Sequence, residues 1–189
     1  MVQPLLFLPE TPSQTAGPFV HIGLTPCHAG IAGIYPGDLT GRPFATGVAI
    51  TVTGTVRDGM GSVLRDVLLE SWQADAEGRF ASGTEGFSRF VADDAGEWRL
   101  VTVKPGRVPA PDGRMQAPHI ALWIVARGIN LGLQTRIYFA DEDNAGDPLL
   151  ARIEGDWRRE TLLARKTGEG AYRFDIVLQG ENETVFLDM

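Results

Sequence analysis

The sequence predicts an all-β protein: an antiparallel β-sandwich with an irregular N-terminal arm and one or two short helices. Short segments in which apolar and polar residues alternate recur from residue 47 onward, which is the pattern of half-buried strands. The chain also holds 23 glycines and 12 prolines, and clusters of them separate these segments as turns. Many short strands with almost no helix favour a sandwich or barrel.

The 189 residues predict one domain, 1–189, which is long enough to bury its own core. Residues 1–46 contain repeated prolines that exclude a long regular element. They also keep many large apolar side chains, which a disordered arm would not carry. We therefore expect an ordered, extended arm that packs on the domain or on a partner chain.

The expected strands cover 49–56, 67–74, 97–103, 117–128 and 134–139, then a hairpin of 161–166 with 171–179, and a last strand over 184–187. No element is expected over 79–93, and the prolines of 104–118 indicate a loop. Asp147 and Pro148 together predict a helix start, with a short helix over 149–153.

The strand over 117–128 is the most apolar run in the sequence. Alternation places His119, Ala121 and Trp123 on one face, and Ile120 and Leu122 on the other. Since both faces are mostly apolar, we expect something to cover each of them. His119 stands alone at the start of this strand, where a hydrogen-bonded structural role is the default interpretation.

Composition excludes several classes of function. The formal charge of −7 argues against binding to nucleic acid or to an anionic membrane surface. The single cysteine, Cys27, cannot form an intramolecular disulfide, which fits a reducing compartment. The apolar run Leu5 to Leu8 is too short for a signal peptide, and no run reaches the length of a membrane span. We expect a cytoplasmic protein.

Residue chemistry alone gives no complete active site. His21 and His28 are seven residues apart in an irregular segment, which is not the spacing of a helical metal pair. The acidic loop from Asp141 to Asp147 fails the calcium-loop pattern, because Arg152 stands where the bidentate glutamate belongs. No serine lies in a nucleophile elbow, and no glycine cluster leads into a helix as a phosphate loop would.

Several motifs resemble the intradiol ring-cleaving dioxygenases, and the resemblance runs nearly from end to end. The segments that carry it, in order, are P-S-Q-T-A-G-P-F (12–19), E-S-W-Q-A-D-A-E-G (70–78), D-A-G-E-W-R-L-V-T-V-K-P-G (94–106), A-P-H-I-A-L-W (117–123), A-Y-R-F-D-I-V-L-Q-G-E (171–181) and E-T-V-F-L-D (183–188). Taken singly each is a modest signal, but together and in this order they are strong.

The resemblance implies a ferric-iron site, and this chain departs from it. Catalytic members hold Fe(III) with two tyrosinates and two histidines, because phenolate oxygens stabilise the ferric state. The corresponding positions here are Phe80, Val108, His119 and Ala121, so three of the four ligands are absent. The tyrosines of the chain, Tyr35, Tyr138 and Tyr172, lie elsewhere. We therefore expect no metal and no catalytic residue in this chain, with the four positions a vestige of the ligand set.

Loss of the ligands is the pattern of the non-catalytic α chain of two-chain family members, in which a β chain of the same fold binds the iron. The resemblance then implies a hetero-oligomer of αβ protomers with a small aromatic acid and O2 as substrates. It assigns to substrate binding the arm residues Thr15, Ala16, Gly17 and Pro18, together with Arg136, whose guanidinium would meet the substrate carboxylate.

Two other interpretations stay open. One is a stand-alone β-sandwich module that binds an aromatic ligand without catalysis. The other is an iron enzyme with a rearranged ligand set of His21, His28 and His119.

Overall fold

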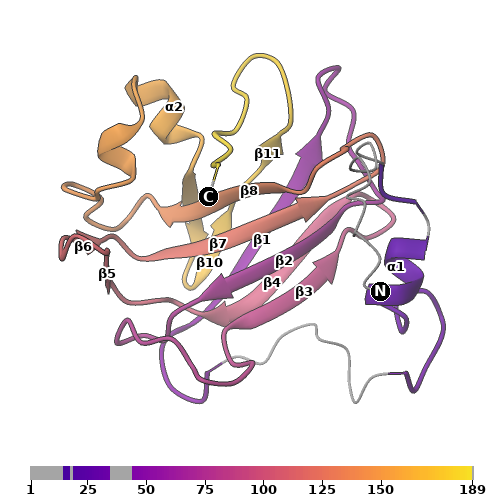
Figure 1. Cartoon of the computed structure of the whole chain (residues 1–189), viewed down its shortest axis with the longest axis horizontal. Coiled ribbons are helices and arrows are strands. Elements are labelled where there is room, and N and C mark those ends of the chain that lie inside the picture. The colour runs from indigo at the N-terminus through magenta and orange to yellow at the C-terminus, as the bar shows by residue number, and fades with distance from the viewer. Residues whose placement is uncertain (1–14, 18, 35–43, 189) are drawn as a thin grey trace, which may run out of the picture.

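A computed structural model describes residues 15–17, 19–34 and 44–188 and shows a two-layered β-sandwich (Figure 1). Nine strands form one continuous sheet in the order β11-β1-β10-β9-β8-β7-β2-β3, with β4 paired to β1. The sheet turns over at β9, so that β4, β1 and β10 face β8, β7, β2 and β3 across a shared core. The predicted fold class is confirmed.

The bounds of the elements, in chain order, are α1 Phe19–Leu24, β1 Ala49–Arg57, β2 Leu68–Gln73, β3 Phe87–Val91, β4 Glu97–Val103, β5 Val108–Pro109, β6 Met115–Gln116, β7 His119–Val125, β8 Leu133–Phe139, the 3₁₀ turn η1 Leu150–Arg152, α2 Asp156–Glu160, β9 Leu163–Gly168, β10 Ala171–Arg173 and β11 Ile176–Val177. Within this described part of the chain, no helix is long and apolar enough to span a membrane.

The core between the layers consists of the inward residues that alternation predicts. Val52, Leu69, Trp98 and Ile120 come from four different strands and are completely buried. The Trp98 ring contacts the Phe90 ring at a centroid distance of 5.6 Å, across the two layers. Each fully buried side chain of this size contributes about 1.5–3 kcal/mol through removal of apolar surface from water.

Several expectations about elements were wrong in detail. The sheet is not purely antiparallel, because β1 pairs with β10 and β11 in parallel and β8 pairs with β9 in parallel. Strand β3 lies inside 79–93, and the short pair β5–β6 lies inside the expected loop 104–118. Residues 184–187 form no strand, although Leu187 N–H donates to the Gln134 carbonyl at 2.8 Å. The parallel pairings join segments that are far apart in the sequence, so local patterns do not reveal them.

The expected strand over 171–179 is divided into β10 and β11 by a side chain. The Asp175 carboxylate accepts hydrogen bonds from the Thr55 N–H and hydroxyl, both at 2.9 Å, where a ladder bond would otherwise form. Arg173 pairs with the same carboxylate at 2.6 Å. Burial raises the pKa of Asp175, but Arg173 and the Thr55 hydrogen bonds outweigh burial and hold the pKa below its usual range. The Asp175 carboxylate therefore replaces a backbone carbonyl as the acceptor for the Thr55 N–H.

The strand β7 is fully buried on one face and, apart from His119, only partly buried on the other. Ile120, Leu122 and Ile124 are at most 2% exposed, whereas Ala121 and Trp123 on the other face are half-buried. The described residues of this chain therefore cover the second face only in part, and its burial against a partner chain remains a prediction.

The N-terminal arm is described only in part, and its described residues contact the domain at several points. The Thr15 hydroxyl accepts a hydrogen bond from Gly128 N–H at 2.5 Å, and the Leu24 carbonyl accepts one from the Arg89 guanidinium at 3.2 Å. The helix α1 lies in this segment. Pro18 and Tyr35 lie outside the described residues, and the arm as a whole remains a prediction.

Substitution of Gly54 should destabilise the sandwich strongly. A Cβ on Gly54 would lie 1.8 Å from the Phe174 carbonyl oxygen and 2.5 Å from the Trp98 ring, so β1 would have to separate from both. We expect Gly54→Ala to lower the free energy of unfolding by roughly 2–3 kcal/mol. Urea unfolding followed by tryptophan fluorescence measures this. The matched control is Gly23→Ala, where nothing lies within 4 Å of the added Cβ. Equal stability of the two variants would contradict the prediction.

Candidate functional site

The positions that the sequence comparison aligned with iron ligands lie on neighbouring elements. Ala121 in β7 pairs with Trp72 in β2, and the Phe80 ring stacks on the Trp72 ring at a centroid distance of 6.1 Å and an interplanar angle of 6°. His119 lies two residues before Ala121, at the start of β7. Val108 in β5 pairs with Gln116 in β6, directly before β7. The fold thus places these four positions close to one another, and their origin as a ligand set remains a prediction.

Arg136 extends from β8 beside this scaffold, because it pairs with Ala121 in the β7–β8 ladder. Its guanidinium donates a hydrogen bond to the Gln116 amide oxygen at 2.7 Å and a longer one, 3.3 Å, to the Tyr138 hydroxyl. Its Nε is buried and has no hydrogen-bond partner in the described part of the chain. Burial of a donor without a hydrogen-bond partner costs free energy. A ligand that supplies an acceptor to this Nε–H would therefore be bound favourably.

The Asp147 carboxylate joins the chain segments that carry this cluster through hydrogen bonds. Asp147 is 1% exposed, and its carboxylate accepts hydrogen bonds from the backbone N–H groups of Ala117 at 2.8 Å, Leu149 at 2.8 Å and Leu150 at 2.9 Å. The Tyr138 hydroxyl donates to the same carboxylate at 3.3 Å. The predicted capping role of Asp147 is therefore found, but the helix it starts is only the 3₁₀ turn η1.

His119 is a neutral, buried imidazole. It is 9% exposed, and its Nδ1 lies 2.8 Å from the Ala117 carbonyl oxygen, which requires that Nδ1 carry the proton. Burial, together with the nearby Arg136 charge, lowers the pKa of His119 to about 4. The structural role expected for this histidine is consistent with this geometry.

Tyr138 is a protonated phenol. Its ring lies 5.5 Å from the His119 ring between centroids, and burial raises the pKa of Tyr138 to about 12. A phenol held in this state donates a hydrogen bond and is a poor source of the phenolate oxygen that ferric iron needs.

The residues of this cluster do not fit ferric iron. Of Phe80, Val108, His119 and Ala121, only His119 has a donor atom. Within the described residues no group of three or more His, Cys, Asp or Glu side chains is arranged to hold a metal ion. The cluster offers instead a guanidinium, a neutral imidazole and a phenol, which together suit an anionic or hydroxylated aromatic group.

The rearranged ligand set of His21, His28 and His119 is wrong. His21 interacts with the backbone of Val67, next to Leu68, and Leu68 pairs with Val125 at the end of β7. His119 lies at the beginning of the same strand, so about 20 Å separate the two histidines at the usual rise per strand residue. The three imidazoles cannot share one ion.

The residues assigned to substrate binding lie in two places in this chain. Thr15 contacts Gly128, in the turn after the end of β7, whereas Arg136 pairs with Ala121 near the beginning of that strand. Ala16 and Gly17 follow Thr15 directly, and Pro18 lies outside the described residues. Their joint role in substrate binding remains a prediction, because this chain alone does not bring them together.

Gln116, Tyr138 and Asp147 are members of the cluster that the sequence did not identify. Tyr138 shares a strand face with Arg136, and Asp147 carries a capping signal. The sequence therefore indicates a local role for each residue but not that they belong to one cluster. Only the pairing of β7 with β8 and the turn at 147–150 bring them together.

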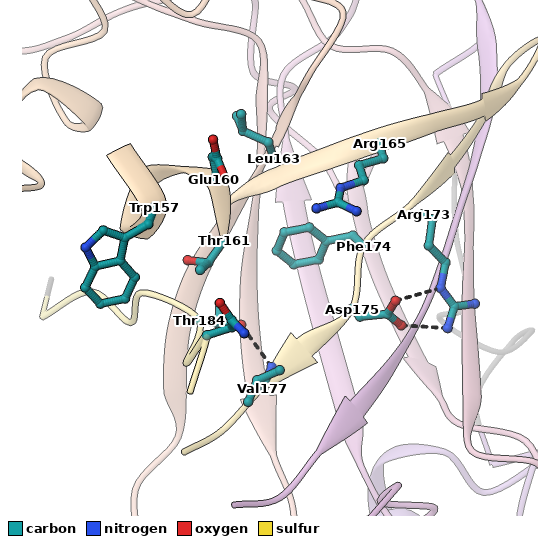
Figure 2. A pocket seen from close by; sticks show the side chains of 11 residues that line it. Trp157, Glu160, Thr161, Leu163, Arg165, Arg173, Phe174, Asp175, Val177 and Thr184 are labelled. Atoms are coloured by element: carbon teal, nitrogen blue, oxygen red, sulfur yellow. Dashed lines mark hydrogen bonds and ion pairs between the residues drawn. The ribbon is translucent and has the colours of Figure 1, made fainter. Parts of the chain in front are cut away.

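A separate hollow of about 310 Å³ lies beside α2 and the strands β9 to β11 (Figure 2). Trp157 lies at one side of it, with Phe174 and the Arg165 guanidinium across from it. The paired Arg173 and Asp175 close one end, and Arg173 also contacts Glu97. Arginine and carboxylate charges largely cancel here, so the hollow has no clear charge preference.

Residues 39–180 match the model of a protein family described as Dioxygenase. The chain belongs to this family. It is 48% identical to the protocatechuate 3,4-dioxygenase alpha chain of Pseudomonas putida, over 98% of this chain and 99% of that one. It is 38% identical to the alpha chain of Burkholderia cepacia and 33% identical to the beta chain of the same organism, the latter over 73% of this chain and 67% of that one.

Solved structures show the same fold. The dioxygenase domain of a carbohydrate-binding fusion protein from Streptomyces sp. SirexAA-E superposes with a TM-score of 0.56 at 24% identity, over 93% of this chain and 100% of that one. The 3-chlorocatechol 1,2-dioxygenase of Rhodococcus opacus gives a TM-score of 0.57 at 20% identity, over 77% and 68% of the two chains.

The pKa of His119 predicts how stability changes in acid. The pKa falls from about 6.5 in the unfolded chain to about 4 in the folded one, so between these values only the unfolded state binds the proton. The contribution of neutral His119 to the free energy of unfolding is therefore fully present above about pH 6.5. It is lost as the pH drops toward 4, which lowers the free energy of unfolding by roughly 3 kcal/mol.

Urea unfolding of the wild type and of His119→Gln at several pH values from 7.5 to 4 measures this effect. Glutamine can still donate to the Ala117 carbonyl but does not titrate. We expect the wild type to lose more stability than the variant on acidification, and parallel profiles would contradict the assignment.

Proposed function

We propose that this chain is the non-iron-binding α subunit of a protocatechuate 3,4-dioxygenase. The assembled enzyme would cleave protocatechuate with O2 between the two hydroxyl-bearing carbons to 3-carboxy-cis,cis-muconate, a step of aromatic degradation by the β-ketoadipate pathway. One observation carries the proposal: the chain is 48% identical to such an α chain from end to end, yet Phe80, Val108 and Ala121 provide no iron donor.

The Fe(III) would be held by a partner β chain. A beta chain is 33% identical to this chain over most of its length, so a partner of the same fold is expected. The α subunit would contribute scaffold, interface and part of the substrate pocket. We expect the complex to work in the cytoplasm, which the lone cysteine fits.

Arg136 would bind the carboxylate of the aromatic substrate. Gln116 and Tyr138 fix the position of its guanidinium, and the buried Nε has no acceptor among the described residues. A guanidinium held in this way can bind a carboxylate through two parallel hydrogen bonds. Thr15, Ala16, Gly17 and Pro18 of the arm would line the pocket of an assembled protomer, where the two chains meet.

The exposed apolar side chains next to the ligand positions would form part of the interface with the β chain. Trp72 is 36% exposed and Phe80 is 52% exposed, and the two rings stack on the half-buried face of β7. A shallow hollow of about 240 Å³ between Trp72, Phe87 and Trp123 continues this face. Aromatic side chains grouped in this way are typical of the buried centre of an interface.

Removal of the Arg136 charge should weaken substrate binding in the assembled enzyme. We expect Arg136→Ala to raise the KM for protocatechuate about tenfold or more, with a smaller change in kcat, because a charge-assisted hydrogen bond is lost. Steady-state kinetics of the co-purified complex measure this. The control is Arg99→Ala, an exposed arginine of β4 with no ion pair within the described structure. Unchanged kinetics in Arg136→Ala would remove the proposed role.

Co-expression with a β chain tests the assembly. We expect this chain alone to aggregate and to be colourless, because its apolar face is uncovered and it lacks a ferric-tyrosinate site. With the β chain it should co-purify as a soluble, iron-containing, active complex. A stable soluble monomer without a partner or activity would favour a stand-alone aromatic-binding module, and an iron-tyrosinate colour in the isolated chain would contradict the ligand assignment.

A further inference from the structure

A groove of about 420 Å³ runs between η1, α2 and the C-terminal segment. In Figure 1 these lie together, with α2 and η1 in orange and the C-terminus beside them. The residues that line it are either apolar or charged. The apolar ones are Leu149, Ile153, Val185, Phe186 and Leu187, and the charged ones are Arg152, Arg158 and Asp188. None of them belongs to the Arg136 cluster.

The floor of the groove is apolar and fixed in place. Ile153 and Val185 are 8% and 6% exposed and pack in the same small core as Leu150 and Tyr138. The Thr135 hydroxyl donates to the Val185 carbonyl at 2.8 Å, which attaches the C-terminal segment to β8. The groove is therefore formed before any ligand arrives, which lowers the entropy cost of binding.

The two helical turns on the other side are also held together. The Arg159 Nε donates to the Leu150 carbonyl at 3.0 Å, so α2 is attached to η1. Arg159 also pairs with Asp156 at 2.5 Å. The neighbouring guanidinium groups of Arg152 and Arg158 have no ion pair or side-chain hydrogen bond within the described residues, and both line the groove.

The charged residues that line the groove indicate the charge of the ligand that it can bind. Among the described lining residues, Arg152 and Arg158 contribute two guanidinium groups and Asp188 one carboxylate, so these residues carry a net positive charge in a chain of net charge −7. A net excess of one cation suits a single carboxylate, which a guanidinium binds in bidentate fashion. The half-buried Phe186 and Leu187 offer the apolar surface for a ring.

The geometry points to a binding site for a small aromatic monocarboxylate in this groove, with Arg152 and Arg158 on the carboxylate and the ring against Phe186 and Leu187. The volume is that of ordinary small-molecule sites. The lining residues lie on α2, η1 and the C-terminal segment, so binding here and the role of Arg136 can succeed or fail separately.

Fluorine NMR titration of the full-length protein with 4-fluorobenzoate tests this site, in complex with the β chain if the two co-purify. We expect saturable binding by the wild type and by an Arg136→Gln variant. In Arg152→Gln/Arg158→Gln the affinity at this site should fall about tenfold or more, since charge-assisted hydrogen bonds are lost. The matched control is Arg65→Gln/Arg99→Gln, which removes two exposed arginines elsewhere and should bind as the wild type does.

Two further probes separate the contributions of charge and ring. Trifluoroacetate carries the carboxylate without a ring, and 4-fluorobenzyl alcohol carries the ring without the charge, so both should bind at least about tenfold more weakly than 4-fluorobenzoate. Ring-cleavage activity of the complex should not change in Arg152→Gln/Arg158→Gln. The site is overturned if this variant binds 4-fluorobenzoate as the wild type does, or if trifluoroacetate binds equally well.

Discussion

The buried carboxylate of Asp147 is the interaction on which the candidate site depends. It joins the start of β7, the end of β8 and the turn η1 through the Ala117, Tyr138 and Leu150 donors. A buried charge is tolerated only when hydrogen bonds satisfy it, so these three elements are held in one arrangement. The positions of Arg136 and His119 follow from it, because both contact residues that Asp147 fixes.

The two faces of strand β7 have different roles in this chain. Its inner face still forms the core of the sandwich, and this does not depend on whether residue 121 is a ligand. On its outer face Ala121 lies beside Trp72, and Phe80 stacks on that ring. This part of the face offers no metal donor and exposes apolar side chains of the kind found at protein contacts.

The edges of the sheet are where sequence patterns give the least information. Strand β3 was not expected, because its alternation over 87–91 follows a stretch without pattern, and its place is set by pairing with β2. Residues 184–187 alternate like a strand, but β8 holds them through the Thr135 hydroxyl and the Gln134 carbonyl, so no ladder forms. Pairing between distant segments decides both cases.

The sequence by itself determined the alternation of the main strands, the Asp147 capping signal and the loss of donor chemistry at Phe80, Val108 and Ala121. These are local properties, since a phenyl, isopropyl or methyl group cannot bind iron in any fold. Only the tertiary structure decided that Arg136 meets Gln116 and Tyr138, that His119 is neutral, and that Arg152 and Arg158 share a groove. Those features depend on burial and on contacts between distant segments, which exist only once the sheet has closed.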